Sequence, residues 1–170
     1  MTPPTLTTDR LTLRAPARPD FEAYAGIMMS DRAEFMLGAL SRQSAWNHFA
    51  SDVASWIIDG FGYWTAETSD HTPVAFVGIT KPAVYPEHEL GWMVPADAEG
   101  KGYAREAAQA ARDWAKAQNL PSLVSYVDKR NTRSRALAER IGATADHTAT
   151  RPEGENSEDT LVYRHWGQAA

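Results

Sequence analysis

The chain has 170 residues, 43% of them hydrophobic and 23% charged, and this length and composition predict one globular domain with a substantial core. Its net charge of −5 argues against general nucleic-acid binding; the absence of cysteine excludes disulfides and thiolate sites, and the five histidines lack metal-ligand spacing, so no metal is expected. Because the chain starts without a basic and apolar leader and no apolar run reaches membrane-spanning length, we expect a cytoplasmic protein without membrane contact.

The first third of the chain predicts one strand and two helices. Leu11 and Leu13 alternate with polar residues before Pro16, as in a short strand. Asp20 is expected to cap a helix over residues 21–29, followed by a loop with a helical turn. Ser41 or Ser44 then opens a longer helix that Gly60 ends. Its expected buried stripe is Ala45, Trp46, Phe49, Val53, Trp56 and Ile57.

Three strands follow, over residues 62–67, 73–81 and 89–94. Turn residues separate them, at 69–71 and again at 82–87. Short connections between successive strands favour antiparallel pairing, so we predict a meander that ends at Pro95.

The stretch from Glu89 to Ala117 reads as strand, loop, glycine pair and helix. Gly100 and Gly102 can take positive φ, and a helix predicted to start after them leaves its first amides unpaired. Lys101 and Arg105 are disfavoured by the helix dipole at this end unless an anion binds nearby. The segment therefore suggests a pyrophosphate cradle, with an ordinary strand–helix connection as the alternative.

The last third predicts one more strand–helix unit and a strand pair. Residues 123–127 form a strand that reaches its predecessor through a helix and is expected to run parallel to it. A helix covers 131–141, and strands are predicted at 143–150 and 160–166. The acidic loop between them, at 153–159, is either a solvated loop or an attractor for a cationic acceptor. The order implies a mixed α/β sheet covered by helices.

In this order and spacing the chain resembles the GCN5-related N-acetyltransferase (GNAT) superfamily, in the branch that acetylates ribosomal-protein N-termini. Its similarity rests on three pieces: Thr8–Arg14; Glu89–Val94 with Gly100–Ala104; and Asn131–Ser134 with Arg140–Ala143. The resemblance implies a single N-acetyltransferase domain over 1–170. It also implies a mostly antiparallel sheet of about seven strands, flanked by helices and splayed into an acyl-CoA cleft.

The resemblance also implies a cofactor site. The backbone of residues 92–94 would hold the pantetheine arm, and the amides of residues 100–104 would hold the pyrophosphate. The helix predicted over 131–141 would contact the CoA arm through Asn131. The cofactor-binding residues expected are Trp92, Met93, Val94, Gly100, Lys101, Gly102, Tyr103, Ala104, Arg105 and Asn131.

The implied reaction is direct transfer of an acetyl group from acetyl-CoA to a primary amine, on a small molecule or a peptide N-terminus. Glu89 is the expected base, acting through water, or else a solvated or ion-paired strand carboxylate; Glu87 and His88 are alternates. Ser134 is the candidate acid, or else a cap or CoA ligand. The amide of Met93 or Val94 could polarise the thioester carbonyl.

Two departures from the family pattern concern the cofactor and the acid. Glu99 stands where the family has Gln or Arg, which removes one expected CoA partner. Ala138 stands where a thiolate-protonating tyrosine often lies. A basic cluster around the start of the helix predicted over 131–141 suggests either a polyanion site or a solvated, ion-paired face. Its members are Lys129, Arg130, Arg133 and Arg135.

Two other functions stay open. A dinucleotide-binding oxidoreductase would use Gly100, Gly102 and Asp128, but Arg105 occupies the third glycine position and the strands before it read as a meander. A non-catalytic acyl-CoA sensor would explain Glu99 and Ala138. A homodimer is plausible for this family.

Overall fold

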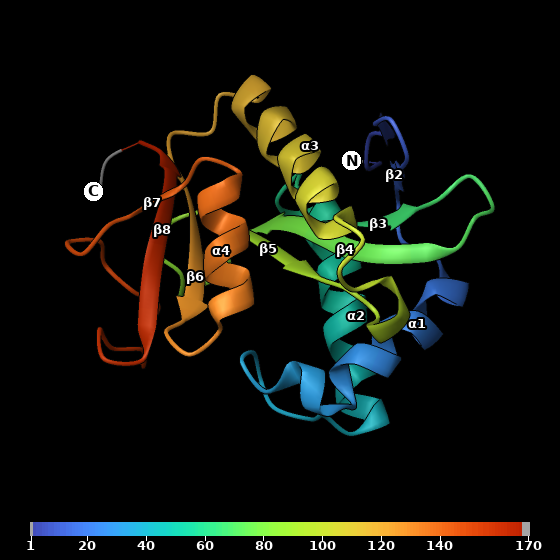
Figure 1. Ribbon diagram of the computed structural model, residues 1–170, viewed down its shortest axis with the longest axis horizontal. Coiled ribbons are helices and arrows are strands. Elements are labelled where there is room, and N and C mark those ends of the chain that lie inside the picture. Colours follow the sequence, from blue (N-terminus) through green and yellow to red (C-terminus); the bar gives the residue numbers. More distant parts are fainter. Residues whose placement is uncertain (1, 168–170) are drawn as a thin grey trace.

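A computed structural model describes residues 2–167, so residue 1 and residues 168–170 of the expected domain lie outside it. Figure 1 shows one sheet with helices packed on it. The helices are α1 (Phe21–Met28), α2 (Arg42–Ile58), α3 (Tyr103–Ala117) and α4 (Thr132–Arg140), with short 3-10 turns η1 (Arg18–Asp20), η2 (Asp31–Ala33) and η3 (Ala96–Ala98). The strands are β1 (Leu6–Thr7), β2 (Thr12–Arg14), β3 (Tyr63–Glu67), β4 (Pro73–Thr80), β5 (Glu89–Met93), β6 (Leu123–Asp128), β7 (Thr144–Ala145) and β8 (Thr160–Trp166).

The eight strands lie in the order β1-β2-β3-β4-β5-β6-β8-β7. Every neighbouring pair is antiparallel except β5 and β6, which are parallel. The predicted meander and its mixed, mostly antiparallel sheet are therefore confirmed. The prediction of about seven strands missed β1, because two residues are too few to show an alternating pattern.

Helix α3 packs on one face of the sheet through its alanines. Ala107, Ala108, Ala111 and Ala115 are fully buried against β4 and β5, so the helix approaches the strands closely. At its far end the indole rings of Trp56, Trp64 and Trp114 meet edge to face. These contacts fix the start of α3 relative to the end of β5, where the glycine loop lies.

The other face of the sheet carries α1 and the first half of α2. Phe21, Tyr24 and Phe49 form an aromatic cluster with Phe76 of β4, at ring-centroid distances of 5.2–5.7 Å. Met93 of β5 belongs to the same cluster. The two helices are thereby anchored beside β5, on the side opposite to α3.

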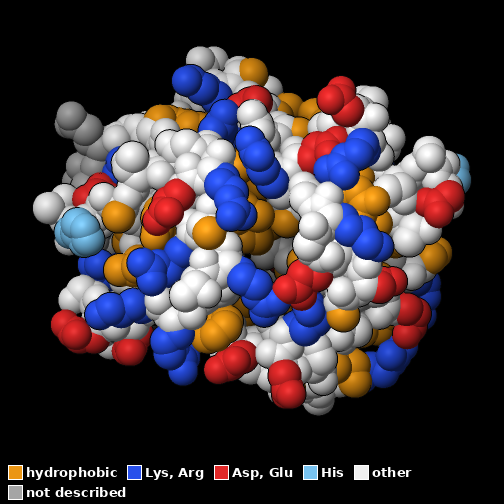
Figure 2. Space-filling view, in the orientation of Figure 1, with side chains coloured by type: hydrophobic (Ala, Val, Ile, Leu, Met, Phe, Trp, Pro, Cys, Tyr) orange, Lys and Arg blue, Asp and Glu red, His pale blue; other side chains and the backbone are white. Residues whose placement is uncertain are grey.

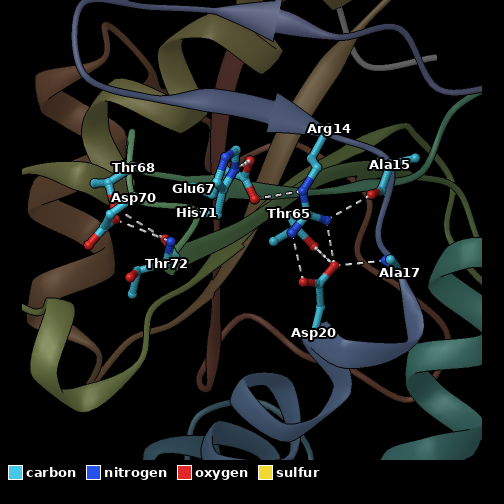
Figure 3. Close-up of polar contacts among 10 residues, drawn as sticks. All are labelled: Arg14, Ala15, Ala17, Asp20, Thr65, Glu67, Thr68, Asp70, His71 and Thr72. Atoms are coloured by element: carbon cyan, nitrogen blue, oxygen red, sulfur yellow. Dashed lines mark hydrogen bonds and ion pairs between the residues drawn. The ribbon is translucent and has the colours of Figure 1, made fainter.

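The expected cap by Asp20 is wrong, because its carboxylate serves a buried ion network instead (Figure 3). Arg14 holds Asp20 through two bonds of 2.7 and 2.9 Å, and its Nε donates to Glu67 at 2.6 Å. The Ala17 amide and the Thr65 hydroxyl also donate to Asp20. The first turn of α1 consequently has no side-chain cap.

Two other expectations need correction. Ser41 is the cap of α2 and accepts a hydrogen bond from the Ser44 amide, but Ile57 is 76% exposed, because Trp56 takes the buried position in that turn. The strand expected at 143–150 shrinks to β7. Its continuation turns away because the Asp146 carboxylate accepts from the amides of Thr148 and Ala149.

Candidate active site

The one parallel strand pair in the described part of the sheet opens into a cleft. Strands β5 and β6 pair at a single register position, Glu89 with Val124, and then diverge. The cavity beside them has a volume of about 1000 Å³. Figure 2 shows a hollow in this face with Lys and Arg side chains gathered around it and hydrophobic side chains inside. All expected site residues except Lys101 line this cleft.

The free edge of β5 forms one wall of the cleft. Ser125 donates to the Leu90 carbonyl oxygen, and Arg32 Nε donates to the Val94 carbonyl oxygen. The carbonyl groups of Leu90 and Val94 therefore point away from β4. Backbone direction alternates along a strand, so Trp92 belongs to the same set, whereas Met93 pairs with Phe76 of β4. The backbone edge turned away from β4 therefore comes from Leu90, Trp92 and Val94, with the carbonyl oxygens of Leu90 and Val94 already hydrogen-bonded to side chains.

The glycine loop between η3 and α3 presents free amides. Gly100 and Gly102 adopt left-handed φ angles of 76° and 80°. Within residues 2–167, no amide from 100 to 105 donates to an intramolecular acceptor. The loop opens a helix of 15 residues, and the side chains of Lys101 and Arg105 are exposed beside it. This geometry fits the oxygens of a pyrophosphate.

The opening segment of the chain braces this loop from outside. Glu106, in the first turn of α3, accepts from the Thr8 hydroxyl at 2.6 Å and from the Arg10 amide and Nε. Arg10 also donates to the Lys101 carbonyl oxygen and lies over the Tyr103 ring. The family resemblance included this segment, but the sequence alone did not predict that it contacts the glycine loop and α3.

Glu99 is held by two arginines from opposite walls. Arg32 of η2 binds one of its carboxylate oxygens at 2.7 Å, and Arg133 of α4 binds the other. The acidic residue therefore gathers two cations at the start of the glycine loop. The sequence predicted only that Glu99 removes one CoA partner. In the structure Glu99 also holds two arginines beside the loop.

Helix α4 contributes Asn131 and Ser134. Asn131 caps the helix by accepting from the Ser134 amide at 3.1 Å. Trp92 Nε1 lies 3.3 Å from Ser134 Oγ, and because indole can only donate, the serine oxygen is the acceptor. Ala138 is fully buried against Val127 and Tyr163, so its position does not face the cleft.

Glu89 lies where β5 and β6 part. Burial raises the pKa of its carboxyl group to about 8, and the negative charges of Glu155 and Asp52 raise it further. The two alternates are engaged elsewhere. Glu87 forms a two-bond ion pair with Arg164 at 2.8 Å, which lowers its pKa, and His88 packs against Phe61. Glu89 is the carboxylate of this group that faces the cleft.

Known proteins share this architecture. A family model described as the acetyltransferase (GNAT) domain matches residues 10–144. The chain belongs to the GNAT acetyltransferase family. It is 42% identical to an acetyltransferase from Agrobacterium tumefaciens strain C58 with a TM-score of 0.89, over 98% of this chain and 96% of that one. The GNAT fold and the acetyltransferase class are therefore confirmed.

More distant structures share the fold with the GNAT chain. The ribosomal-protein-S5-alanine acetyltransferase from Vibrio fischeri is 16% identical, with a TM-score of 0.71 over 98% of both chains. RimL, the ribosomal L7/L12 alpha-N-protein acetyltransferase, was solved with coenzyme A; it is 16% identical with a TM-score of 0.73, over 98% of this chain and 100% of that one. Both belong to the ribosomal-protein branch that the sequence pointed to.

The oxidoreductase alternative is wrong for this GNAT chain. A dinucleotide fold needs parallel βαβ repeats, whereas β5 and β6 are the one parallel pair among the described strands. Asp128, its expected ribose ligand, is paired with Arg130 at 2.9 Å.

The basic cluster of the GNAT domain is mostly engaged with protein groups. Arg130 binds Asp128, Arg133 binds Glu99, and Arg135 donates to the Lys129 carbonyl oxygen and the Tyr163 hydroxyl. This favours the ion-paired face over a polyanion site for the arginines. Among the residues described, no group of three or more His, Cys, Asp or Glu could hold a metal, and no helix is long and apolar enough to span a membrane.

Several cleft residues were missed from the sequence, among them Tyr24, Arg32, Asp52 and Tyr63. Asp52 left a signal, because it interrupts the apolar stripe of α2 between Phe49 and Trp56. A carboxylate on the buried side of a helix is unusual unless it serves a site.

Proposed function

We propose that Glu89 is the general base of an N-acetyltransferase that moves the acetyl group directly from acetyl-CoA to a primary amine. The observation that carries this assignment is its place in the fold. Glu89 stands at the last paired position of β5 and β6, beside the exposed backbone edge that begins at Leu90. A carboxyl group with a pKa of about 8 is well matched to taking a proton from an amine near neutral pH.

The chain's own groups divide the remaining work. The amides of residues 100–105 would hold the CoA pyrophosphate, and the free edge of Trp92 and Val94 would hold pantetheine. The attacking nitrogen forms a bond to the acetyl carbon while the carbon–sulfur bond breaks, and the amine proton passes to Glu89. Since Met93 directs its backbone toward β4, the Val94 amide is the better donor to the carbonyl oxygen.

Ser134 is the proposed acid for the departing thiolate. Its oxygen accepts from Trp92, so its hydroxyl hydrogen is free to point into the cleft. Asn131 would then act mainly through its cap, which orients the turn that carries Ser134. A serine is a weak acid, so we expect orientation of the reactants to supply most of the acceleration.

The acceptor class is also a proposal. Two of the similar structures are named as ribosomal-protein acetyltransferases and another as a spermidine N-acetyltransferase, which supports an amine on a protein or a small molecule for this chain. A homodimer, a cytoplasmic location and a single domain over 1–170 stay predictions from the sequence.

The test is release of the CoA thiol from acetyl-CoA with a panel of primary amines and peptides. Because the chain has no cysteine, a thiol reagent reports only the product. We expect amine-dependent thiol release with an acetyl mass gain on the acceptor, and its loss in Gly102→Trp, which blocks the loop. Acetyl-CoA binding without release for any amine would favour the sensor alternative instead.

A further inference from the structure

The half of the cleft opposite α3 and α4 has its own polar lining. Tyr24 of α1, Asp52 of α2 and Tyr63 of β3 line the same cavity as Glu89. The Tyr24 hydroxyl donates to Asp52 Oδ2 at 2.8 Å, which fixes the orientation of that carboxylate. These groups lie beyond the cofactor edge of β5, where an acceptor would have to reach Glu89.

Two glycines make room for the Tyr63 side chain in this half. Tyr63 is paired with Gly78 of β4, and Gly78 is paired with Gly91 of β5. A Cβ on Gly78 would lie 2.5 Å from the Tyr63 ring, and one on Gly91 would overlap its hydroxyl. The ring therefore lies across both strands, and its hydroxyl has no hydrogen-bond partner within the described chain.

The Tyr126 hydroxyl does not add a second available phenol. Tyr126 lines the cavity, but its hydroxyl oxygen is buried and interacts with the Glu87 backbone. Within the described chain, Tyr63 thus leaves one phenol hydroxyl available to a ligand in this half of the cleft.

Within residues 2–167, neither Asp52 nor Glu89 is paired with a basic side chain. The charged groups that act on Glu89 are Glu155 and Asp52, and the group that acts on Asp52 is Tyr24. Burial raises the pKa of Asp52 to about 7, as it raises that of Glu89. Two of the arginines that line the cleft, Arg32 and Arg133, engage Glu99 and Val94 at the other end. Buried carboxylates without a cation favour a cationic ligand.

We infer that Asp52 is a specificity-determining residue that binds a second, protonated nitrogen of the acceptor while the reacting amine lies at Glu89. The acceptor class is thus a primary amine that carries another ammonium or guanidinium group. A small diamine and a peptide N-terminus followed by a basic side chain share this chemistry. The inference rests on the proposed transfer reaction, and it adds Asp52 as the residue that selects the acceptor.

The test compares putrescine with butylamine, which have the same four-carbon chain and differ in the second ammonium group. We expect kcat/KM to be about tenfold or more higher for putrescine. In Asp52→Asn this preference falls toward one, mainly through a higher KM for putrescine, with a smaller change in kcat. Asp59→Asn, an exposed position on the end of the same helix, is the matched control and keeps the preference.

Peptides distinguish the two sources of the acceptor. A Ser-Lys peptide preferred over Ser-Ala, with putrescine inactive, would place the second cation on a peptide; the reverse would indicate a small diamine. Equal kcat/KM values for both members of each pair, or an Asp52→Asn variant that retains the preference, would overturn the inference.

A binding measurement separates this inference from the transfer reaction itself. Calorimetry on the CoA-loaded protein, where no transfer occurs, should detect putrescine and show its loss in Asp52→Asn, with partial weakening in Tyr24→Phe. Binding that these variants leave unchanged, or no binding of any dibasic probe, contradicts it. Absent thiol release together with Asp52-dependent binding would instead count against the proposed reaction alone.

Discussion

The Ser125 hydroxyl donates to the Leu90 carbonyl oxygen at 2.7 Å, just beyond the point where β5 and β6 stop pairing. A side chain thus satisfies a backbone group that a continued ladder would have used. Ser125 is itself buried, with His165 Nε2 3.0 Å from its oxygen. The two strands can separate at this place without leaving the first free carbonyl unpaired, and the separation makes the cleft.

Replacing Ser125 tests whether its hydrogen bond to Leu90 supports the separation of β5 and β6. Ser125→Ala leaves the Leu90 oxygen without its partner, and we expect a loss of about 1–2 kcal/mol in the free energy of unfolding. Ser55→Ala, which removes a hydroxyl bonded to its own helix, should change stability by less than about 0.5 kcal/mol. Urea denaturation measures both. Equal effects of the two variants would mean that the Ser125 bond is not what supports the divergence.

The glycine loop can be tested with a matched pair of substitutions. Gly102 and Gly154 both have left-handed φ angles, 80° and 89°, so alanine strains either position by about 1 kcal/mol. Only Gly102→Ala should also weaken CoA binding, by about tenfold, because it moves the free amides. Calorimetric titration of CoA compares them. Similar affinities in both variants would place the pyrophosphate elsewhere.

Glu99 offers a prediction with an unusual direction. Its carboxylate lies at the start of the phosphate cradle, and it occupies Arg32 and Arg133. Glu99→Gln should therefore tighten CoA binding several-fold by freeing both cations, whereas Arg133→Gln should weaken it. Stability should fall by no more than about 1 kcal/mol, since the pairs are partly exposed. Weaker CoA binding in Glu99→Gln would show that the bridged arrangement itself is required.

The Arg14 network predicts acid sensitivity without a catalytic role. Hydrogen bonds from Arg14, Ala17 and Thr65 lower the pKa of Asp20 below its ordinary value of 3.8. The ionised carboxylate thus stabilises the fold at neutral pH, and this contribution is lost as pH falls through the lowered pKa. Asp20→Asn should cost about 3 kcal/mol at pH 7 and much less in strong acid, with KM for acetyl-CoA unchanged. A pH-independent effect on unfolding would contradict this role.

Much of this fold could be read from local patterns. The alternation of Leu90, Trp92 and Val94, the two glycines and the alanine stripe of α3 located the strand, loop and helix correctly, because each pattern reflects its own packing. Asp20 and Ile57 were misjudged for the opposite reason. Arg14 of β2 binds Asp20 from outside the helix that Asp20 was expected to cap, and Trp56 takes the buried position that Ile57 was expected to share. Both outcomes depend on tertiary contacts.

The site divides in the same way. The cofactor side is continuous in sequence and could be located from residues 89–105. The acceptor side is assembled from α1, α2 and β3, and the position of Tyr63 depends on Gly78 and Gly91 in other strands. The one signal that the sequence contains for this side is the position of Asp52, a carboxylate within the apolar stripe of α2.

The role of Glu89 is tested most directly by the pH dependence of kcat/KM. With its pKa raised to about 8, Glu89 gains its basic form as pH rises through that value. The wild type should show a rising limb near pH 8, measured with the best acceptor from the amine panel. Glu89→Gln should lose this limb and fall by about a hundredfold at its plateau. A variant with the wild-type profile and rate would contradict the assignment of Glu89 as the base.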